Sequence, residues 1–149
     1  MNAGEICNRE VVIARRDMRL AEAARLMADH HVGSLVVVVD RRQERVPVGI
    51  VTDRDLTLAV LAKDVDPRTI QVGEVMSSEL ATVREEDSVT EVLRVMRERG
   101  VRRVPVLATD GALVGIVTID DVLDIMAEQL RDVVHAIARE QVRETRTRR

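Results

Sequence analysis

The string VGIVT occurs twice in this chain, at Val48–Thr52 and Val114–Thr118, and an aspartate follows each copy three residues later, Asp55 in the first and Asp121 in the second. A repeat constrains a fold more than any single motif does, because both copies must form the same structural unit. Each unit ends with a threonine and an acid at the start of a helix. We therefore expect two related clefts where the duplicated units pack together.

The similarity between the two halves extends upstream of this string. The helical apolar spacing i, i+3, i+4, i+7 begins at Leu20 and again at Val89, an offset of 69 residues. From Val48 to Val114 the offset is 66, so the first repeat has three extra residues between its strands. The pattern predicts repeats over residues 1–68 and 69–130. A C-terminal helical extension and basic tail are expected over 131–149.

Periodicity predicts strand, helix, strand, strand, helix in each unit, which is a fold of the α/β (α+β) class. The strands are nearly continuous Val, Ile and Leu, a composition typical of strands buried on both faces. Asp110-Gly111 predicts a tight hairpin in the second unit, whereas a longer polar loop, Asp40–Arg45, is expected in the first. Asp17 is expected to cap the first helix, and Ser88 with Glu91 to form a capping box on the second. The expected bounds are 10–14, 20–30, 34–39 and 47–52, then 79–83, 89–99, 103–108 and 113–118.

The helices after the two VGIVT strings are expected to differ in length. The first should end near Lys63, because Asp64–Pro67 interrupts it. The second should continue, since an apolar stripe runs through Leu130 and Ile137 beyond what one repeat needs. From Arg139 the chain is polar and basic and is expected to fray. An apolar stripe without cover marks an interface, so the sequence predicts a homodimer.

Composition excludes several classes of protein. The net charge of −3 argues against a nucleic-acid-binding protein, and the absence of Phe, Tyr and Trp removes aromatic stacking on an exposed base. No apolar run approaches the ~20 residues that span a membrane. The N-terminal residues do not resemble a secretory signal, and the single Cys7 fits a reducing compartment, so a cytoplasmic protein is expected.

The pattern V-G-I-V-T-x-x-D at a strand-to-helix junction is the main candidate for a binding site. Gly49 and Gly115 permit close backbone approach. A threonine at a helix N-cap can cap the helix or bind a phosphate, which the helix dipole also favours. The aspartate one turn later can accept two hydrogen bonds from the vicinal diol of a ribose. For a single copy a simple helix cap would be the better explanation, but two copies at equivalent places favour a ligand.

These residues resemble a known family, the tandem cystathionine β-synthase (CBS) domain pair, or Bateman module, of the stand-alone bacterial and archaeal type. The resemblance covers about Ile6 to Glu128. It rests on VGEVM (Val72–Met76), VRRVPVL (Val101–Leu107), and the pair VGIVTDRDL and VGIVTIDDV. It implies that the two units pack about a pseudo-twofold axis and form two clefts. Each cleft would take an adenosine-based ligand such as AMP, ADP, ATP, NAD or S-adenosylmethionine.

The resemblance also implies a role for individual residues. The aspartate of T-x-x-D would bind ribose hydroxyls, the threonine would approach phosphate, and adenine would lie against apolar residues of the other unit. Carried over to this chain, one cleft combines Thr118, Asp121 and Arg103 with Val12, Val32 and Ser34. The other combines Thr52, Arg54 and Asp55 with Ser77, Ala81 and Val101.

The two clefts are expected to be unequal. Arg103 stands where related modules place a phosphate-binding base, and its repeat counterpart, Ser34, has no charge, which favours a polyphosphate in the Asp121 cleft. At another pair of equivalent positions, the first repeat has Arg54 and the second has Asp120, which favours phosphate binding in the Asp55 cleft. The sequence leaves open which of the two binds more strongly.

Catalytic and metal sites are not expected. Cys7 has no histidine partner in a nucleophile motif, and His30-His31 would need further ligands for a metal. The sequence therefore predicts a non-enzymatic regulatory module that binds an adenine nucleotide and acts allosterically on an unidentified effector protein. The alternative is a dimeric protein–protein interaction scaffold that binds no nucleotide.

Overall fold

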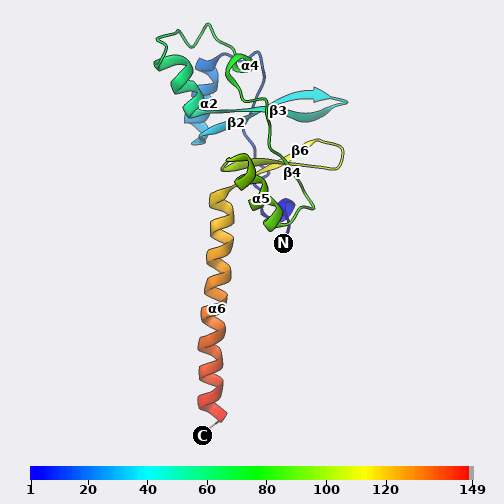
Figure 1. The fold of residues 1–149 in the computed structure, drawn as a ribbon, viewed down its shortest axis with the longest axis vertical. Coiled ribbons are helices and arrows are strands. Elements are labelled where there is room, and N and C mark those ends of the chain that lie inside the picture. The colour runs from blue at the N-terminus through cyan, green and yellow to red at the C-terminus, as the bar shows by residue number, and fades with distance from the viewer. Residues whose placement is uncertain (148–149) are drawn as a thin grey trace.

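Each repeat is built on a three-stranded sheet in which the first strand runs parallel to the second and the second antiparallel to the third. The computed structural model describes residues 1–147. The predicted α+β class and the duplication of one unit are confirmed, and the two sheets meet where β3 lies against β6 (Figure 1). The strands are β1 (Ile13–Ala14), β2 (Ser34–Arg41), β3 (Glu44–Thr52), β4 (Val83–Arg84), β5 (Arg103–Leu107) and β6 (Leu113–Thr118).

Two amphipathic helices have the bounds that the apolar spacing predicts, α2 (Leu20–His30) and α5 (Val89–Arg99). Both end on a residue in the left-handed region, His31 (φ 53°) and Gly100 (φ 64°), which lie 69 positions apart. The same offset therefore extends from sequence to backbone conformation. The remaining helices are α1 (Ala3–Ile6), α3 (Asp53–Leu56), the π-helical turn η1 (Thr57–Leu61), α4 (Val72–Val75) and α6 (Ile119–Thr147).

The expected loop at Asp40–Arg45 is wrong. β2 and β3 continue into it, with Asp40 paired to Arg45 and Arg41 to Glu44. Only Arg42 and Gln43 form the turn, both with positive φ (52° and 66°). Two left-handed central residues give the turn the twist of the flanking strands. The hairpin therefore projects from the body as a long arm (Figure 1). By contrast with β2 and β3, the strands β1 and β4 are shorter than expected and have two residues each.

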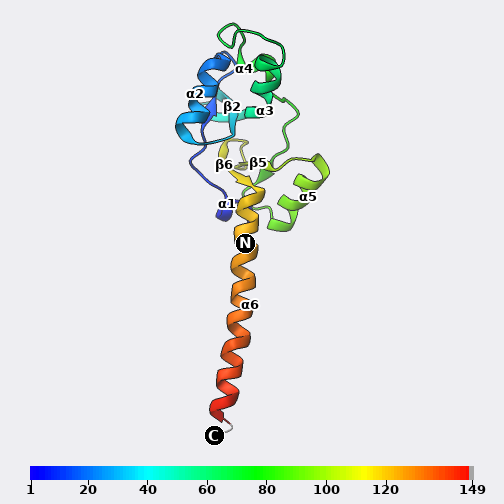
Figure 2. The ribbon, with the colours of Figure 1, turned by 90° about the vertical axis from the view of Figure 1, so that its left-hand side faces the viewer.

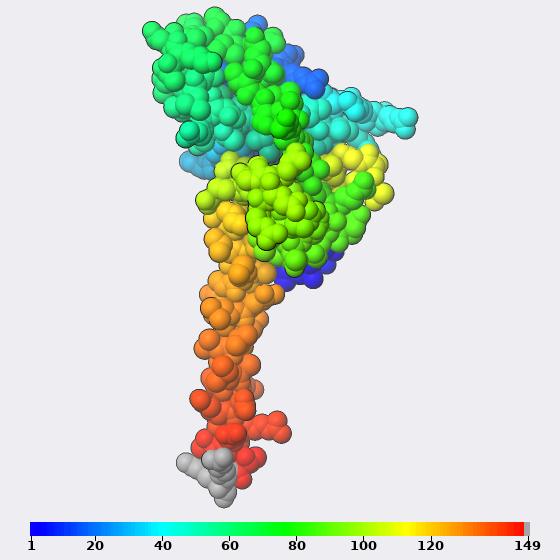
Figure 3. All heavy atoms as spheres, viewed as in Figure 1, coloured from blue at the N-terminus to red at the C-terminus, as the bar shows by residue number. Residues whose placement is uncertain are grey.

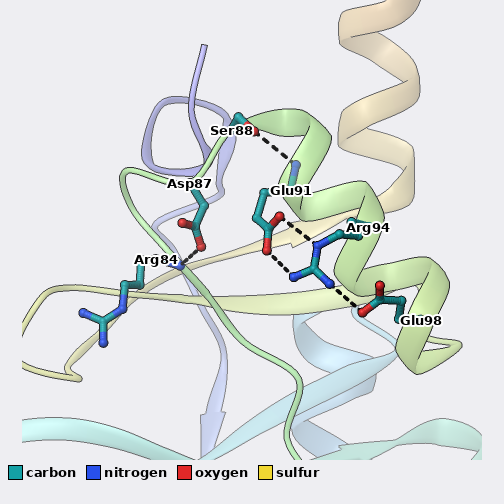
Figure 4. A network of polar contacts seen from close by, with 6 residues as sticks. All are labelled: Arg84, Asp87, Ser88, Glu91, Arg94 and Glu98. Atoms are coloured by element: carbon teal, nitrogen blue, oxygen red, sulfur yellow. Dashed lines mark hydrogen bonds and ion pairs between the residues drawn. The ribbon is translucent and has the colours of Figure 1, made fainter.

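The predicted caps are partly correct. Arg19, not Asp17, occupies the N-cap of α2, and no side chain caps that end. Ser88 accepts a hydrogen bond from the Glu91 N–H (3.1 Å), but the Glu91 carboxylate binds Arg94 instead of closing the box. Arg94 also reaches Glu98 (2.5 Å), so one guanidinium bridges two acids along α5 (Figure 4).

The fraying expected from Arg139 is not seen, because α6 continues as a helix to Thr147. Residues 148–149 of the predicted tail lie outside the described residues. Alternating Arg, Glu, Gln and Ala are strong helix formers, which explains the continuation. Every residue from Met126 to Thr147 is exposed. α6 stands away from the two repeats as a single rod (Figures 2 and 3).

The two hydrophobic cores do not follow the order of the repeats. Ala3 is fully buried in the core of the second repeat, and Val72 in the core of the first. The residues that follow α1 and α4 add backbone pairs to the sheets: Asn8 exchanges two hydrogen bonds with Ile116 (2.9 and 3.0 Å), and Ser77 exchanges two with Ile50 (2.9 and 3.1 Å). Each repeat is thus completed by the segment that precedes the other.

Gly49 and Gly115 make this exchange possible. A β-carbon on Gly49 would lie 2.8 Å from the Ser77 carbonyl oxygen, and one on Gly115 would lie 2.7 Å from the Asn8 carbonyl oxygen. The predicted close approach is therefore present, but it is made by the protein's own backbone. The glycine of each VGIVT is required for the interlocking of the repeats.

We expect Gly49→Ala and Gly115→Ala each to lower the free energy of unfolding by about 1–3 kcal/mol, the usual cost of overpacking. Chemical denaturation followed by circular dichroism measures this change. Gly73→Ala is the comparison and should cost less, because an added β-carbon there would come no closer than 3.2 Å to another residue. Equal stabilities for all three variants would contradict the assigned role of the glycines.

Candidate functional site

A reciprocal pair of hydrogen bonds opens the helix after each VGIVT. The Thr52 N–H donates to Asp55 Oδ2 (2.8 Å), and the Asp55 N–H donates to Thr52 Oγ1 (3.1 Å). Thr118 and Asp121 repeat the arrangement at 2.9 and 3.2 Å. Both threonines therefore cap their helices as predicted. The aspartates are held in place by the backbone, with one carboxylate oxygen engaged.

The other oxygen of Asp55 and of Asp121, Oδ1, takes no hydrogen bond from residues 1–147. A carboxylate oxygen can accept more than one hydrogen bond. Capping therefore fixes the direction of each carboxylate without using its full capacity. Such an acceptor beside helix N–H groups can bind a polar ligand.

A cavity of about 540 Å³ lies beside Asp55 and draws its walls from both repeats. Its apolar surface comes from Ile50, Leu80 and Val101, and its charged surface is made by three arginines and three acids. This volume is in the range of small-molecule sites, which combine apolar walls with a few polar groups. The lining residues are Ile50, Thr52, Asp53, Arg54, Asp55, Ser77, Glu79, Leu80, Gly100, Val101, Arg102 and Arg103.

The structure thus brings together five of the six residues predicted for this cleft, Thr52, Arg54, Asp55, Ser77 and Val101. The sixth, Ala81, is buried in the core of the second repeat and does not line the cavity. Sequence reasoning missed several lining residues, among them Arg102 and Leu80. The predicted residues Val101 and Ser77 lie close to them in the sequence and were the signal that could have found them.

Arg103 was predicted for the Asp121 cleft, whereas the structure places it in the wall of the other cavity. Arg103 pairs with Thr118 across the sheet, yet it lines the cavity of Asp55. Its guanidinium lies near Gly33, where an added β-carbon would be 3.7 Å from Arg103 Nη1 and 3.3 Å from Asp53 Oδ2. The cavity lies between the end of β3 and the start of β5. Arg103 of the second repeat therefore lies beside the T-x-x-D motif of the first repeat.

The repeat offsets identify the residues at equivalent positions around Asp121. Backbone hydrogen bonds confirm the equivalence: the Asp53 N–H donates to the Gly33 carbonyl (3.0 Å), and the Ile119 N–H donates to the Arg102 carbonyl (2.8 Å). Each cavity arginine has a counterpart that lacks positive charge. Arg54, Arg102 and Arg103 correspond in turn to Asp120, Gly33 and Ser34.

Val12, Val32 and Ser34 were predicted for the Asp121 cleft. Val12 and Val32 pack against the core of the first repeat. Ser34 is half-buried and pairs with Thr52 at the start of β2. Val32 and Ser34 stand at the positions equivalent to Val101 and Arg103, whereas Val12 corresponds to Ala81, which lies outside the cavity.

Cys7 lies close to the second motif. Burial raises the pKa of its thiol, and the negative charges of Glu85 and Asp121 raise it further against the opposing effect of Arg9. A raised pKa keeps the thiol protonated at neutral pH, the opposite of what an activated nucleophile needs. Within residues 1–147, no cluster of His, Cys, Asp and Glu could hold a metal ion. None of the helices described there is long and apolar enough to span a membrane.

Comparison with known proteins identifies relatives of the chain. It is 38% identical over 120 residues to hypoxic response protein 1 of Mycobacterium tuberculosis, covering 80% of this chain and 81% of that one. An uncharacterised protein of Methanopyrus kandleri is 33% identical over 125 residues, 84% of this chain but only 62% of the relative's length.

Solved structures resemble the fold over most of the chain. Hypoxic response protein I, solved with two coordinated zinc ions, gives a TM-score of 0.72 at 35% identity, covering 83% of this chain and 98% of that one. The CBS domain pair of protein MJ0100, solved with 5′-methylthioadenosine and S-adenosyl-L-methionine, gives 0.74 at 25% identity over 87% and 98%. The cytosolic domain of the Mg²⁺ channel MgtE, solved with ATP, gives 0.69 at 32% identity over 83% and 48%.

The model of the CBS domain family matches this sequence twice, over residues 3–62 and 72–128. The two matches coincide with the two structural repeats, each with its own T-x-x-D capping box. The chain belongs to the CBS domain family and carries two CBS repeats.

Proposed function

We propose that this chain is a non-catalytic regulatory module whose Asp55 cavity binds an adenine nucleotide. The cavity beside Asp55 carries the proposal, because it joins an oriented carboxylate, three arginines and an aliphatic wall in one space. CBS pairs that resemble this chain were solved with adenosine-containing ligands, S-adenosyl-L-methionine in one and ATP in another. The chemistry of the cavity suits the same class of ligand.

Each part of a nucleotide would have a partner in the cavity. Asp55 Oδ1 would accept hydrogen bonds from the ribose hydroxyls. Arg54, Arg102 and Arg103 would bind the phosphates, since guanidinium groups form short charge-assisted bonds to phosphate oxygens. The adenine would lie between aliphatic side chains, because the chain has no aromatic residue to stack on it. AMP, ADP and ATP fit this pattern, and NAD or S-adenosylmethionine share its adenosine portion.

Binding in this cavity would connect the two repeats. Its carboxylate comes from the start of α3 and its Arg103 from β5, so a ligand would contact both units at once. A ligand that binds one arrangement of the repeats better shifts the population toward it. We propose that an effector protein reads this shift.

The second candidate is an interaction scaffold that binds no nucleotide. The hydrogen-bonded capping boxes favour it, because they give Thr52, Asp55, Thr118 and Asp121 a structural role without a ligand. The exposed apolar side chains of α6 favour it as well.

Calorimetric titration with AMP, ADP, ATP, NAD, S-adenosylmethionine and adenosine tests the two candidates. The chain has no Trp or Tyr, so absorbance near 260 nm in the pure protein would report a co-purified nucleotide, which heat extraction and chromatography would identify. A ligand-free sample that binds none of these compounds at millimolar concentration would establish the scaffold.

We expect Asp55→Ala to weaken nucleotide binding by about 2 kcal/mol, roughly 30-fold, because charge-assisted hydrogen bonds to the ribose are lost. Titration of the variant with ATP and adenosine should show a similar loss for both. Asp55→Asn is the matched control for the helix cap, since an amide oxygen can still accept the Thr52 N–H. Asp121→Ala should leave this cavity unchanged, and unaltered affinity in the Asp55→Ala, Asp121→Ala double variant would exclude the ribose assignment.

Arg103→Ala should discriminate between ligands by phosphate number. ATP and ADP should lose at least tenfold in affinity, about 1.4 kcal/mol, whereas adenosine should be little affected because it has no group to meet the guanidinium. Arg99→Ala, an exposed arginine at the end of α5 outside the cavity, is the control. Equal losses for adenosine and ATP would show that Arg103 has a structural role only.

We further propose that the module is a homodimer. Along α6, Leu123, Leu130 and Ile137 are 54%, 66% and 52% exposed, and a contiguous apolar surface of this kind marks an interface. Light scattering should give about twice the chain mass of 16.7 kDa. Leu130→Glu with Ile137→Glu should yield a monomer, because an unpaired buried carboxylate is costly. Asp132→Glu, off the stripe, should remain dimeric, and a monomeric wild type at high micromolar concentration would refute the proposal.

A further inference from the structure

Seven apolar residues along one face of α6 have a symmetric spacing, and the exposed Val142 lies outside this set. The stripe consists of Leu123, Met126, Ala127, Leu130, Val133, Val134 and Ile137. The intervals between them are 3, 1, 3, 3, 1 and 3 residues, which read the same in both directions from Leu130. Two copies of α6 related by a twofold axis at Leu130 and running in opposite directions would therefore place apolar residues opposite one another along the whole stripe.

The charges of α6 distinguish this arrangement from a parallel one. Residues 119–129 contain four acids and no base, whereas residues 131–147 contain four arginines and three acids. A parallel pair would place the acidic halves side by side, which is destabilising. An antiparallel pair would place the acidic half of each helix beside the more basic half of the other.

A groove lies at the base of α6, at the level that the end of such a partner would reach. It has a volume of about 780 Å³, and its lining includes Leu93, Val101, Ile119 and the first stripe residue, Leu123. In the first repeat, η1 curls back and packs Ala59 and Val60 against the core. Because α6 runs straight instead, the groove on the equivalent face of α5 is larger, about 780 Å³ against about 220 Å³ between α2 and η1.

The positive charge of the groove is complementary to the acidic residues near the end of α6. Arg97 and Arg102 line the groove, and within residues 1–147 Arg97 forms no ion pair, while Arg102 has only a 4.0 Å contact with Asp120. Arg94, also in the lining, is held by Glu91 and Glu98 (Figure 4). Glu140 and Glu144 continue the stripe three and seven residues beyond Ile137, so they would face these arginines in an antiparallel pair.

We infer that two copies of this chain pair through antiparallel α6 helices about Leu130, and that the last turns of each α6 occupy the α5–α6 groove of the other. This inference rests on the proposed homodimer, and its tests use no nucleotide, although Arg102 lines both the groove and the Asp55 cavity. The overlap is long, because α6 spans ~43 Å at ~1.5 Å per residue. The two pairs of repeats would then lie at opposite ends of the helical pair.

Cross-linking of the full chain in a Cys7→Ala background tests the orientation. Ile137→Cys and Leu123→Cys are compared singly and together, with a short bismaleimide. In an antiparallel pair the two thiols introduced by Ile137→Cys would be about 21 Å apart along the helices, roughly 14 residues at ~1.5 Å each. The same separation holds for Leu123→Cys, so neither single variant should cross-link. The double variant should form a covalent dimer.

Efficient dimer formation by Ile137→Cys alone would show a parallel pair and overturn the inference while leaving the homodimer intact. A wild-type protein that is monomeric in light scattering would overturn both the antiparallel pair and the homodimer. Neither result bears on nucleotide affinity, which is measured separately.

Charge reversal tests whether the groove binds the partner's α6. Glu140→Arg with Glu144→Arg should raise the dimer dissociation constant at least tenfold, and adding Arg97→Glu should recover part of the loss. Glu128→Arg, on the opposite side of α6 from the stripe, is the control and should have little effect. If the Glu140→Arg, Glu144→Arg variant dimerises as strongly as the wild type, the groove is not the site of the partner's helix.

Discussion

The backbone exchange between segments that precede one repeat and the sheet of the other is the constraint on which the rest of the structure depends. Ser77 pairs with Ile50, and Asn8 pairs with Ile116, each through two hydrogen bonds. Buried backbone groups must be paired, so neither repeat is complete without the other's leading segment. This interlocking also positions the cavity, because it brings Ser77 beside the T-x-x-D motif of the first repeat.

The duplicated backbone carries different chemistry at its two equivalent places. Both capping boxes have nearly the same distances, so the geometry of the two aspartates is shared. The charge differs, because the three arginines that line the Asp55 cavity have an aspartate, a glycine and a serine at their repeat-equivalent positions. Because the backbone is fixed by interlocking, side chains at these positions can change without altering the fold. A duplicated module can in this way carry different charges around its two T-x-x-D motifs.

The sequence was informative where structure is determined locally. The bounds of α2 and α5 follow from apolar periodicity, and the tight turn at Gly111 follows from its positive φ. The exchange of segments could not be predicted, because α1 and α4 are four-residue helices whose position depends on tertiary contacts. Arg103 was misplaced for a related reason. Its strand partner is Thr118, but which cleft its side chain enters depends on how the two sheets meet.

The contrast between η1 and α6 shows how one repeated motif gives two different endings. α3, which η1 continues, and α6 start from equivalent capping boxes, and at an offset of 66 residues Val60 corresponds to Met126. Val60 packs against the core, whereas Met126 is 53% exposed. In the first repeat, the chain turns back because it must reach α4 and complete the exchange with Ile50. After Thr118, α6 instead continues in a straight line to Thr147 and carries its apolar residues away from the core. The same start of a helix therefore leads to a covered apolar face in the first repeat and an exposed one in the second.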